Sequence, residues 1–505
     1  MLIVQCITAI PSGNLSLLGL KRNAISFSHT NSAARRVDRP CCFFALCCLL
    51  FQVIQPRFLE RVPDGRLPGT WLERRKQLVL LQKQAKKGQG MESVTGQKEK
   101  GPLTGLKVID VSHVMAGPAC AMLLADMGAD VIKVEKLPGG DDARRMVPPA
   151  ISGESAAFLI MNRNKRGIAL DLKTEAGRSV LSRLLHDADV LIENYRRGTM
   201  ERMGFGYDAL HKMNPKLIYC SISGFGRTGP YADRGGFDLV TQGMSGLMSI
   251  TGEGPGCPPV KIGAPVTDIT AGILGCVGVL AALHARASTG QGQMVDTSLF
   301  EAGIIQTYWQ SAICFATGKA PGPMGTAHPL NAPYQAFPAA DGWITVGAAN
   351  QGNWLRLLEA LEAPELGHDP RFANNAERMR NLPALQAALT PLFKTRGSAE
   401  WLHRLEEAGV PAGPVLDVHQ MHADPQALAR EMIVKTTHPT AGQVTSIGLP
   451  IKFSETPGSI RRAAPVLGQH TREVLRERGF SDAETDEMAA LGAIKMPDPI
   501  KAITP

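Results

Sequence analysis

Apolar and polar positions follow a regular rhythm in the first half of the chain, from about residue 106 onward. Short apolar runs of strand length are LKVIDVSH (106–113), DVIKVE (130–135), GIALDL (167–172), DVLIENY (189–195) and LIYCSISGFG (217–226). Segments with helical spacing separate them, and the first, AGPACAMLLADMGA (116–129), has Pro118 well placed in a first turn. Because strand, helix and strand follow within 35 residues, the pattern predicts right-handed parallel units and an α/β fold.

Ligands of such sheets bind beyond the carboxyl ends of the strands. Residues at those ends are His113, Glu135, Lys136, Asn194, Tyr195 and Gly224. The turn after the first strand, SHVMAGP, lacks GxGxxG, so a nicotinamide dehydrogenase is disfavoured. Glu135 alone is a weak indication of ribose binding, and we expect it to be a solvated strand end.

The second half of the chain begins with a long apolar segment behind Asp268, followed by a glycine turn and a strand within residues 288–300. A loop-rich stretch over 320–345 precedes helices with polar faces and a tight strand entry at Pro411, Gly413 and Pro414. We therefore expect a Rossmann-like parallel-sheet large domain that is split in sequence, plus a smaller α+β domain. The expected boundaries are an N-terminal extension 1–100, large domain 101–300, linker 301–325, small domain 326–430, return to the large domain 431–497 and tail 498–505.

The charge of the protein is unevenly distributed. The first 100 residues hold 16 Lys and Arg against 6 Asp and Glu, which leaves 38 basic and 40 acidic residues in the remainder. The body therefore lacks the electrostatic signature of a nucleic-acid-binding protein. Half of the ten cysteines lie in the first 50 residues, and the others form no Cys/His cluster with zinc spacing. Isolated thiols are typical of a reducing compartment, so we expect a cytoplasmic location and no metal.

The first hundred residues differ from the rest in composition. Their apolar run CCFFALCCLL is short for a membrane span, and residues 1–37 contain no acid. A misassigned start codon, with Met91 as the true start, is the favoured interpretation. A cleaved targeting segment, which would place the protein in the mitochondrial matrix, and a membrane anchor are the alternatives. In each case we expect these residues to lie outside the fold and the body not to be a membrane protein.

Asp268 is the most informative single residue. Fifteen residues without a charge follow it, as far as His284. Thr267 and Asp268 are both good N-cap residues, so a purely structural role is one interpretation. The glycines Gly272, Gly275 and Gly278 predict close packing of this helix against another backbone. An ionised carboxylate at a helix N-terminus can also attack a thioester, which is the second interpretation.

Eight motifs occur together and in order: HVMAGP, GADVIKVE, NRNKRGIALDLK, ENYRRGTMERMGFGY, SGFGRTGP, VTDITAG, GVPAGPV and LGQHT. Through them, residues 102 to about 494 resemble the family III CoA-transferases, among them formyl-CoA transferase and L-carnitine CoA-transferase. The segments GTAHPLNAPYQAF and SGLMSITG are most similar to the succinyl-CoA:glutarate type. The resemblance implies a homodimer of two interlocked rings.

The resemblance also implies a reaction and a set of site residues. Asp268 would be acylated by an acyl-CoA donor to give an aspartyl-acyl anhydride, and CoA would then pass through an aspartyl-CoA thioester to a carboxylic acid acceptor without a metal or redox cofactor. The implied CoA contacts are Val114, Met115, Ala116, Lys136, Leu170, Asp171, Leu172, Lys173, Asn194, Tyr195, Arg196 and Arg202. A mobile loop containing Gly325, Thr326 and His328 would cover the site, with His328 near the acceptor carboxylate.

Alternative functions within this resemblance differ in the residues they need. Met115 replaces the glutamine of formyl-CoA transferase, which places formyl-CoA/oxalate specificity in doubt. A 2-methylacyl-CoA racemase of the same fold needs a histidine where this chain has Phe237, and Phe237 cannot exchange a proton. A non-catalytic CoA-binding protein is the third alternative. Succinyl-CoA or another short acyl-CoA is the expected donor.

Overall fold

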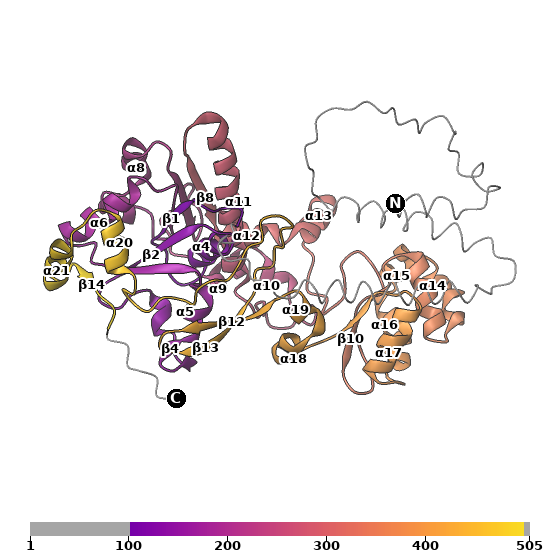
Figure 1. Ribbon diagram of the computed structural model, residues 1–505. Coiled ribbons are helices and arrows are strands. Elements are labelled where there is room, and N and C mark those ends of the chain that lie inside the picture. Colours follow the sequence, from indigo (N-terminus) through magenta and orange to yellow (C-terminus); the bar gives the residue numbers. More distant parts are fainter. Residues whose placement is uncertain (1–100, 499–505) are drawn as a thin grey trace, which may run out of the picture. The chain divides into compact units, whose positions relative to one another are not determined.

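The computed structural model of the protein describes residues 101–498 (Figure 1). The three interpretations of the N-terminal extension therefore lie outside the described residues. A seven-stranded sheet dominates the described part, with smaller antiparallel sheets beside it. The strands of the large sheet are β1 (Lys107–Asp110), β2 (Asp130–Lys136), β5 (Lys165–Leu170), β6 (Val190–Glu193), β7 (Ile218–Ser223), β8 (Met294–Ser298) and β14 (Ile494–Lys495).

The strand order of this sheet is β14-β5-β2-β1-β6-β7-β8. All neighbouring pairs are parallel except β14 with β5. The chain therefore builds outward from β1 through β2 to β5, then returns to the other side of β1 and continues through β6 to β8. This is the order of a doubly wound sheet, whose crevice opens where the direction reverses, between β1 and β6.

Alternate residues of each strand enter two separate cores, as expected for a sheet covered on both faces. Ile109 of β1 packs with α6 (Glu175–Leu185) and α20 (Thr471–Glu477). Its neighbour Val108 packs on the opposite face with α4 (Ala116–Asp126) and α11 (Val266–Thr289). The mixed α/β fold expected from the sequence, with its predominantly parallel sheet, is confirmed. Each predicted apolar run contains all or part of a strand, although β2 ends one residue beyond its run and β5 begins two residues before its run.

Helix α11 packs closely on its neighbours through its glycines. A Cβ atom added at Gly272 would lie 2.7 Å from the carbonyl oxygen of Ala116, and one added at Gly278 would lie 2.5 Å from Cγ1 of Val295. By length and composition alone, α11 could cross a membrane, but the core helix of a globular domain passes the same test. Because its glycine face is buried against α4 and the sheet, we assign α11 to the core.

The C-terminal segment lies against the edge of the large sheet. After α20 and α21 (Asp482–Ala490), β14 pairs with β5. Arg166 of β5 forms ion pairs with Asp130, Glu473 and Glu477, at 2.7, 2.9 and 2.7 Å respectively. Arg166 therefore connects β5 to both β2 and α20.

A second core surrounds the three-stranded sheet β11-β10-β9. Its strands are β9 (Tyr334–Pro338), β10 (Trp343–Gly347) and β11 (Ala412–Pro414), and its main helices are α14 (Gln351–Ala360), α16 (Leu382–Phe393) and α17 (Ser398–Glu407). The sequence pattern had predicted these helices. It had not predicted α12 (Leu299–Ile305), α13 (Tyr308–Thr317), α18 (Val418–Ala423), α19 (Pro425–Ala429) or the hairpin β12 (Ile433–His438) and β13 (Gly442–Ile447). The predicted linker 301–325 thus contains most of α12 and all of α13.

Candidate active site

One amide side chain connects the ends of β1 and β6 through two hydrogen bonds. Asn194, directly after β6, accepts a hydrogen bond from the His113 backbone N–H at 2.8 Å and donates to the His113 carbonyl at 2.8 Å. The ring of Tyr195 meets the ring of His113 edge-on, with 4.5 Å between centroids. The ends of these two strands, which the sequence placed among the ligand-binding positions, are therefore in direct contact.

The residue after His113 adopts an unusual backbone conformation. Val114 has a φ of 64°, in the left-handed region that β-branched residues strongly disfavour. Met115 is the N-cap of α4 and makes no capping hydrogen bond with its side chain, and Ala116 begins the helix. The chain thus turns sharply between the strand end and the helix.

Asp268 lies at the same end of the site as this turn. The close neighbours of Gly272 are Ala116 and Ala119, and those of Gly275 include Cys120, so α4 and α11 run in the same direction. Asp268 precedes Gly272 by one helical turn and therefore lies beside the beginning of α4. The three predicted CoA contacts Val114, Met115 and Ala116 share this end of the helix pair with the predicted nucleophile.

The prediction that Asp268 caps its own helix is wrong. The N-cap of α11 is Pro265, and Asp268 lies inside the first turn, without a hydrogen bond or ion pair to any described residue. The cap comes instead from Asp238, the first residue of α9 (Asp238–Met244), whose Oδ1 accepts from the Thr267 N–H at 3.0 Å and from its hydroxyl at 2.8 Å. The carboxylate of Asp268 is consequently left without a structural partner.

The pKa of Asp268 is raised from an ordinary value of 3.8 to about 6, first by burial and second by the negative charge of Asp238. The sequence analysis expected an ionised carboxylate, and a pKa of about 6 is compatible with that at neutral pH, although the charge is less favourable than for an ordinary carboxyl group. Above pH 6 the group is still mainly ionised. It is then a partly desolvated carboxylate, which is a better nucleophile than a fully hydrated one.

Arg196 connects the β6 end to the segment that carries Asp238. A Cβ atom added at Gly235 would lie 3.0 Å from Nη2 of Arg196, so the guanidinium lies over this glycine. The next residue, Gly236, packs backbone to backbone against Gly224 after β7. A side chain at Gly224 or Gly236 would collide with the opposite backbone, so glycine is needed where the chain passes from the sheet edge to Phe237 and Asp238.

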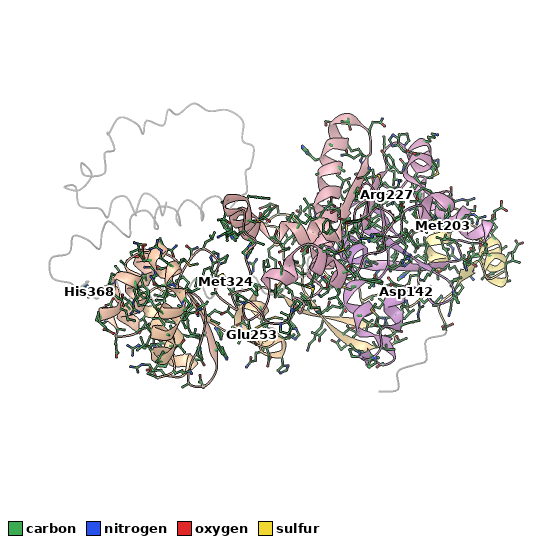
Figure 2. The ribbon with its side chains drawn as sticks, turned by 180° about the vertical axis from the view of Figure 1, so that it is seen from behind. Asp142, Met203, Arg227, Glu253, Met324 and His368 are labelled. Atoms are coloured by element: carbon green, nitrogen blue, oxygen red, sulfur yellow. The ribbon has the colours of Figure 1, made fainter. Side chains whose placement is uncertain are left out.

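The other predicted CoA contacts lie around the β2 and β5 ends. Lys136 is half-exposed and forms an ion pair with Asp142 at 2.8 Å; Asp142 is labelled in Figure 2. A shallow depression is lined by Leu137, Pro138, Asp171, Lys173, Gly492, Ile494 and Lys495. Leu170 is completely buried in the core and does not line this depression, so the structure does not expose it as a CoA contact. Leu172 is half-buried beside it.

Arg202 belongs to α7 (Thr199–Arg202), is exposed and donates to the Thr199 hydroxyl at 3.0 Å. Glu135, by contrast, is wrongly predicted as a solvated strand end. It is 1% exposed, its Oε2 accepts from the Asp141 N–H at 3.0 Å, and it holds Arg144 through two hydrogen bonds of 2.6 and 2.7 Å. Both carboxylate oxygens are therefore engaged, which removes the indication of ribose binding.

Hydrogen bonds fix the predicted substrate loop at several points. Gly325 has a φ of 61°, and its N–H donates to the Gly252 carbonyl at 2.9 Å; the adjoining residues Met324 and Glu253 are labelled in Figure 2. The hydroxyl of Thr326 accepts from the Ala336 N–H at 3.0 Å.

His328 stacks on Tyr334 with 5.0 Å between ring centroids, and its Nδ1 accepts from the Leu330 N–H at 3.1 Å. Burial lowers the pKa of His328, which favours the neutral ring. Since Nδ1 is an acceptor, the ring proton of the neutral form resides on Nε2. Among the described residues, no hydrogen bond or ion pair connects this loop to Asp268.

Two residues that the sequence analysis overlooked contribute to the site. Asp238 follows the noted Phe237 directly, and Asp141 accepts from the Val114 N–H at 3.0 Å. Phe237 itself is 75% exposed, and its phenyl ring has no exchangeable proton, so this position supplies no proton-transfer group. Only the three-dimensional packing reveals which carboxylates meet these backbone groups.

Known proteins match this chain along most of its length. The family model described as CoA-transferase family III matches residues 103–471. The chain is 40% identical to a succinate–glutarate CoA-transferase of Agrobacterium fabrum, covering 75% of this chain and 96% of that protein. It is 41% identical to an acetyl-CoA:oxalate CoA-transferase of Acetobacter aceti, covering 78% and 100%.

A solved structure gives the same result for the fold. The crystal structure of a CAIB/BAIF family protein from Brucella suis is 41% identical, with a TM-score of 0.68 over 75% of this chain and 100% of that one. The acids named for the relatives differ, whereas the transfer of CoA between an acyl-CoA and a carboxylic acid is common to them. The chain belongs to CoA-transferase family III and is a CoA-transferase.

Proposed function

We propose that this CoA-transferase uses Asp268 as its nucleophile and takes succinyl-CoA, or another short acyl-CoA, as the donor. The observation that carries the proposal is the state of Asp268. It is a half-buried carboxylate in the first turn of a helix whose N-terminal hydrogen bonds are made by Asp238 instead. Among the described residues, this carboxylate has no hydrogen bond or ion pair that would be lost when it reacts.

The reaction consists of four acyl transfers. The Asp268 carboxylate attacks the thioester carbonyl of the donor, which forms a mixed anhydride and releases CoA as its thiolate. The thiolate attacks the Asp268 carbonyl carbon, which gives an aspartyl-CoA thioester and frees the donor acid. The acceptor carboxylate then displaces the thiolate to form a second anhydride, and the thiolate attacks the acceptor carbonyl. Acceptor acyl-CoA leaves, and the Asp268 carboxylate is restored.

The basic side chains around the sheet edge support a CoA site there. Lys136, Lys173 and Arg196 lie at the carboxyl ends of β2, β5 and β6, where doubly wound sheets bind their ligands. CoA brings several phosphate charges, which Lys and Arg side chains neutralise. In this proposal the nucleotide lies along the β2 and β5 ends, and the thioester reaches Asp268 at the α4–α11 end.

The acceptor is proposed to be a dicarboxylic acid. The relatives named for glutarate and for oxalate both take such acids, and their names are the support for this choice. His328, whose Nδ1 is already an acceptor and whose Nε2 carries the ring proton, is the proposed donor to the second carboxylate of the acceptor.

A CoA-exchange assay tests the proposal. Purified protein is incubated with succinyl-CoA or acetyl-CoA and a panel of mono- and dicarboxylic acids, and new acyl-CoAs are separated by chromatography. We expect exchange in the wild type, none in the isosteric variant Asp268→Asn, and unchanged exchange in Asp208→Asn, which alters an exposed carboxylate. Activity retained by Asp268→Asn would contradict the proposed nucleophile. Binding of CoA without exchange for any pair would indicate a non-catalytic CoA-binding protein.

We also propose that the protein is a homodimer. Helix α13 has no buried residue in the described chain, and Phe315, Tyr308 and Trp309 on it are 88%, 72% and 59% exposed. The apolar residues Ile269, Ile273 and Val277 of α11 are also exposed. Exposed apolar helices of this kind mark protein–protein interfaces, and the family resemblance supports a second copy as the occupant.

A further inference from the structure

The turn between β1 and α4 is held by side chains from distant parts of the chain. The Ser112 N–H donates to Oδ1 of Asp110 at 3.0 Å, and its carbonyl accepts from Nζ of Lys133 at 2.7 Å. Asn194 satisfies both backbone groups of His113. Asp141 accepts from the Val114 N–H at 3.0 Å.

Four of the charged groups behind this turn form a completely buried network. Nζ of Lys133 lies 2.9 Å from Oδ2 of Asp141 and 3.8 Å from Oδ2 of Asp110. Lys165 adds a 2.9 Å ion pair to the same Asp110 carboxylate and donates to the Pro118 carbonyl at 2.9 Å. Two lysines thus balance two aspartates. Buried ion pairs contribute little net stability compared with apolar packing, so the network requires another explanation.

Val114 supplies that explanation. A left-handed backbone costs an L-residue free energy, and β-branching adds to this cost, so the conformation persists only where the surroundings over-determine it. Asp141 accepts the hydrogen bond of the Val114 N–H, next to the strained φ torsion of Val114. The carboxylate of Asp141 is itself held by the ion pair with Lys133 and by the Ala143 N–H at 2.9 Å. The strain lies directly beside Met115 and Ala116, at the end of the helix pair that carries Asp268.

We infer that Asp141, fixed by Lys133, is a positioning residue that holds Val114 in its left-handed conformation and thereby sets the turn His113–Ala116 against the acyl-CoA. Asp141 acts through the Val114 N–H and does not touch substrate. The inference rests on the proposed function in one respect, namely that the acyl-CoA binds at this end of α4 and α11.

The test uses the ability of glycine to adopt a left-handed backbone without strain. Asp141→Ala removes the acceptor, and misplacement of the turn should lower kcat/KM for the acyl-CoA on the order of 100-fold. Adding Val114→Gly in that background should restore about tenfold, because glycine populates the required conformation by itself. Val114→Ala removes the same side-chain contacts but relieves only the part of the strain that comes from β-branching, so it should restore much less activity than Val114→Gly. With Asp141 intact, the variants Val114→Gly and Val114→Ala should have activities similar to each other.

Two further measurements separate positioning from general destabilisation. Asp126→Asn breaks another buried pair, with Arg163 at 2.7 Å, at the opposite end of α4, and should lower the melting temperature without changing KM for the acyl-CoA. Hydrogen exchange of peptide 112–117 should accelerate in Asp141→Ala and not in Asp126→Asn. If Asp141→Ala does not fold, Asp141→Asn takes its place. It keeps an acceptor oxygen for Val114 but loses the charge opposite Lys133, and we expect a smaller loss and a smaller rescue.

The inference is overturned if Val114→Gly and Val114→Ala rescue equally, or if Asp141→Ala leaves both exchange at 112–117 and kcat/KM unchanged. Calorimetric titration with CoA distinguishes this failure from that of the proposed function. Weakened CoA binding and faster exchange in Asp141→Ala, together with an active Asp268→Asn enzyme, would support the positioning role and reject only the proposed nucleophile.

Discussion

Replacing Asp268 by asparagine should stabilise the protein while it abolishes activity. The pKa of this carboxyl group is about 6 in the folded protein, against an ordinary value of 3.8. The folded state therefore binds a proton more tightly than the unfolded state, and ionisation of Asp268 costs stability as the pH rises between these values. The difference of about two pH units corresponds to about 3 kcal/mol above pH 6. That pKa already includes every effect of the fold on the charge, so we expect Asp268→Asn to gain about 3 kcal/mol at pH 8.

Urea denaturation at pH 8 and at pH 5, at one fixed protein concentration, measures this effect. At pH 5 the carboxyl group is mostly protonated in the folded protein, and the stabilisation should fall to roughly half its value at pH 8. Asp208→Asn, an exposed exchange of the same kind, is the matched control. An Asp268→Asn variant with the same stability difference at both pH values, or with lower stability than the wild type at pH 8, would refute the assignment of a desolvated carboxylate without partners.

Other consequences of the site geometry can be tested separately. Asp238→Asn removes the neighbouring negative charge, so the acid limb of the kcat/KM–pH profile should move to lower pH, by less than about one unit because burial is the larger cause of the raised pKa; an upward or absent displacement would contradict this electrostatic coupling. Gly272→Ala would place a Cβ 2.7 Å from the Ala116 carbonyl oxygen and should destabilise the protein by about 1–3 kcal/mol in chemical denaturation, whereas Gly342→Ala, which meets open space, should not. Phe315→Arg should lower the fraction of protein that assembles as the proposed dimer, as measured by sedimentation velocity, and an unchanged dimer fraction would argue against α13 as part of the interface.

Much of the sheet could be predicted because its strands are buried on both faces. The strands β1, β2, β5, β6 and β7 lie in short, mainly apolar runs, and the helical segments between these runs indicate parallel pairing. Helices α12, α13, α18 and α19 were not predicted, because they are short and their sequences lack a clear division into apolar and polar faces. In the described chain α13, α18 and α19 bury no residue, so packing within one chain imposes no periodic pattern on them.

The site was predicted less evenly than the fold. Asp268 stands out because a charge precedes a long apolar helix, and that contrast is visible in the sequence. The role of Asp238 is not visible, because its bonds to Thr267 connect residues 29 positions apart. Glu135 was misjudged for a similar reason: strand ends are usually solvated, but here the following chain folds back and places Arg144 against the carboxylate. Sequence spacing identifies reactive side chains more readily than it identifies the partners that fix them.

Trapping the reaction intermediate tests the central claim most directly. The protein is incubated with succinyl-CoA, quenched with hydroxylamine and digested, and the peptide that contains Asp268 is analysed by mass spectrometry, with Asp238 in its own peptide as the internal comparison. Hydroxylamine converts an activated aspartyl carbonyl into a hydroxamate. We expect this modification at Asp268 alone and only when acyl-CoA is present. An unmodified Asp268 under conditions in which CoA exchange proceeds, or a hydroxamate at another carboxylate, would contradict it.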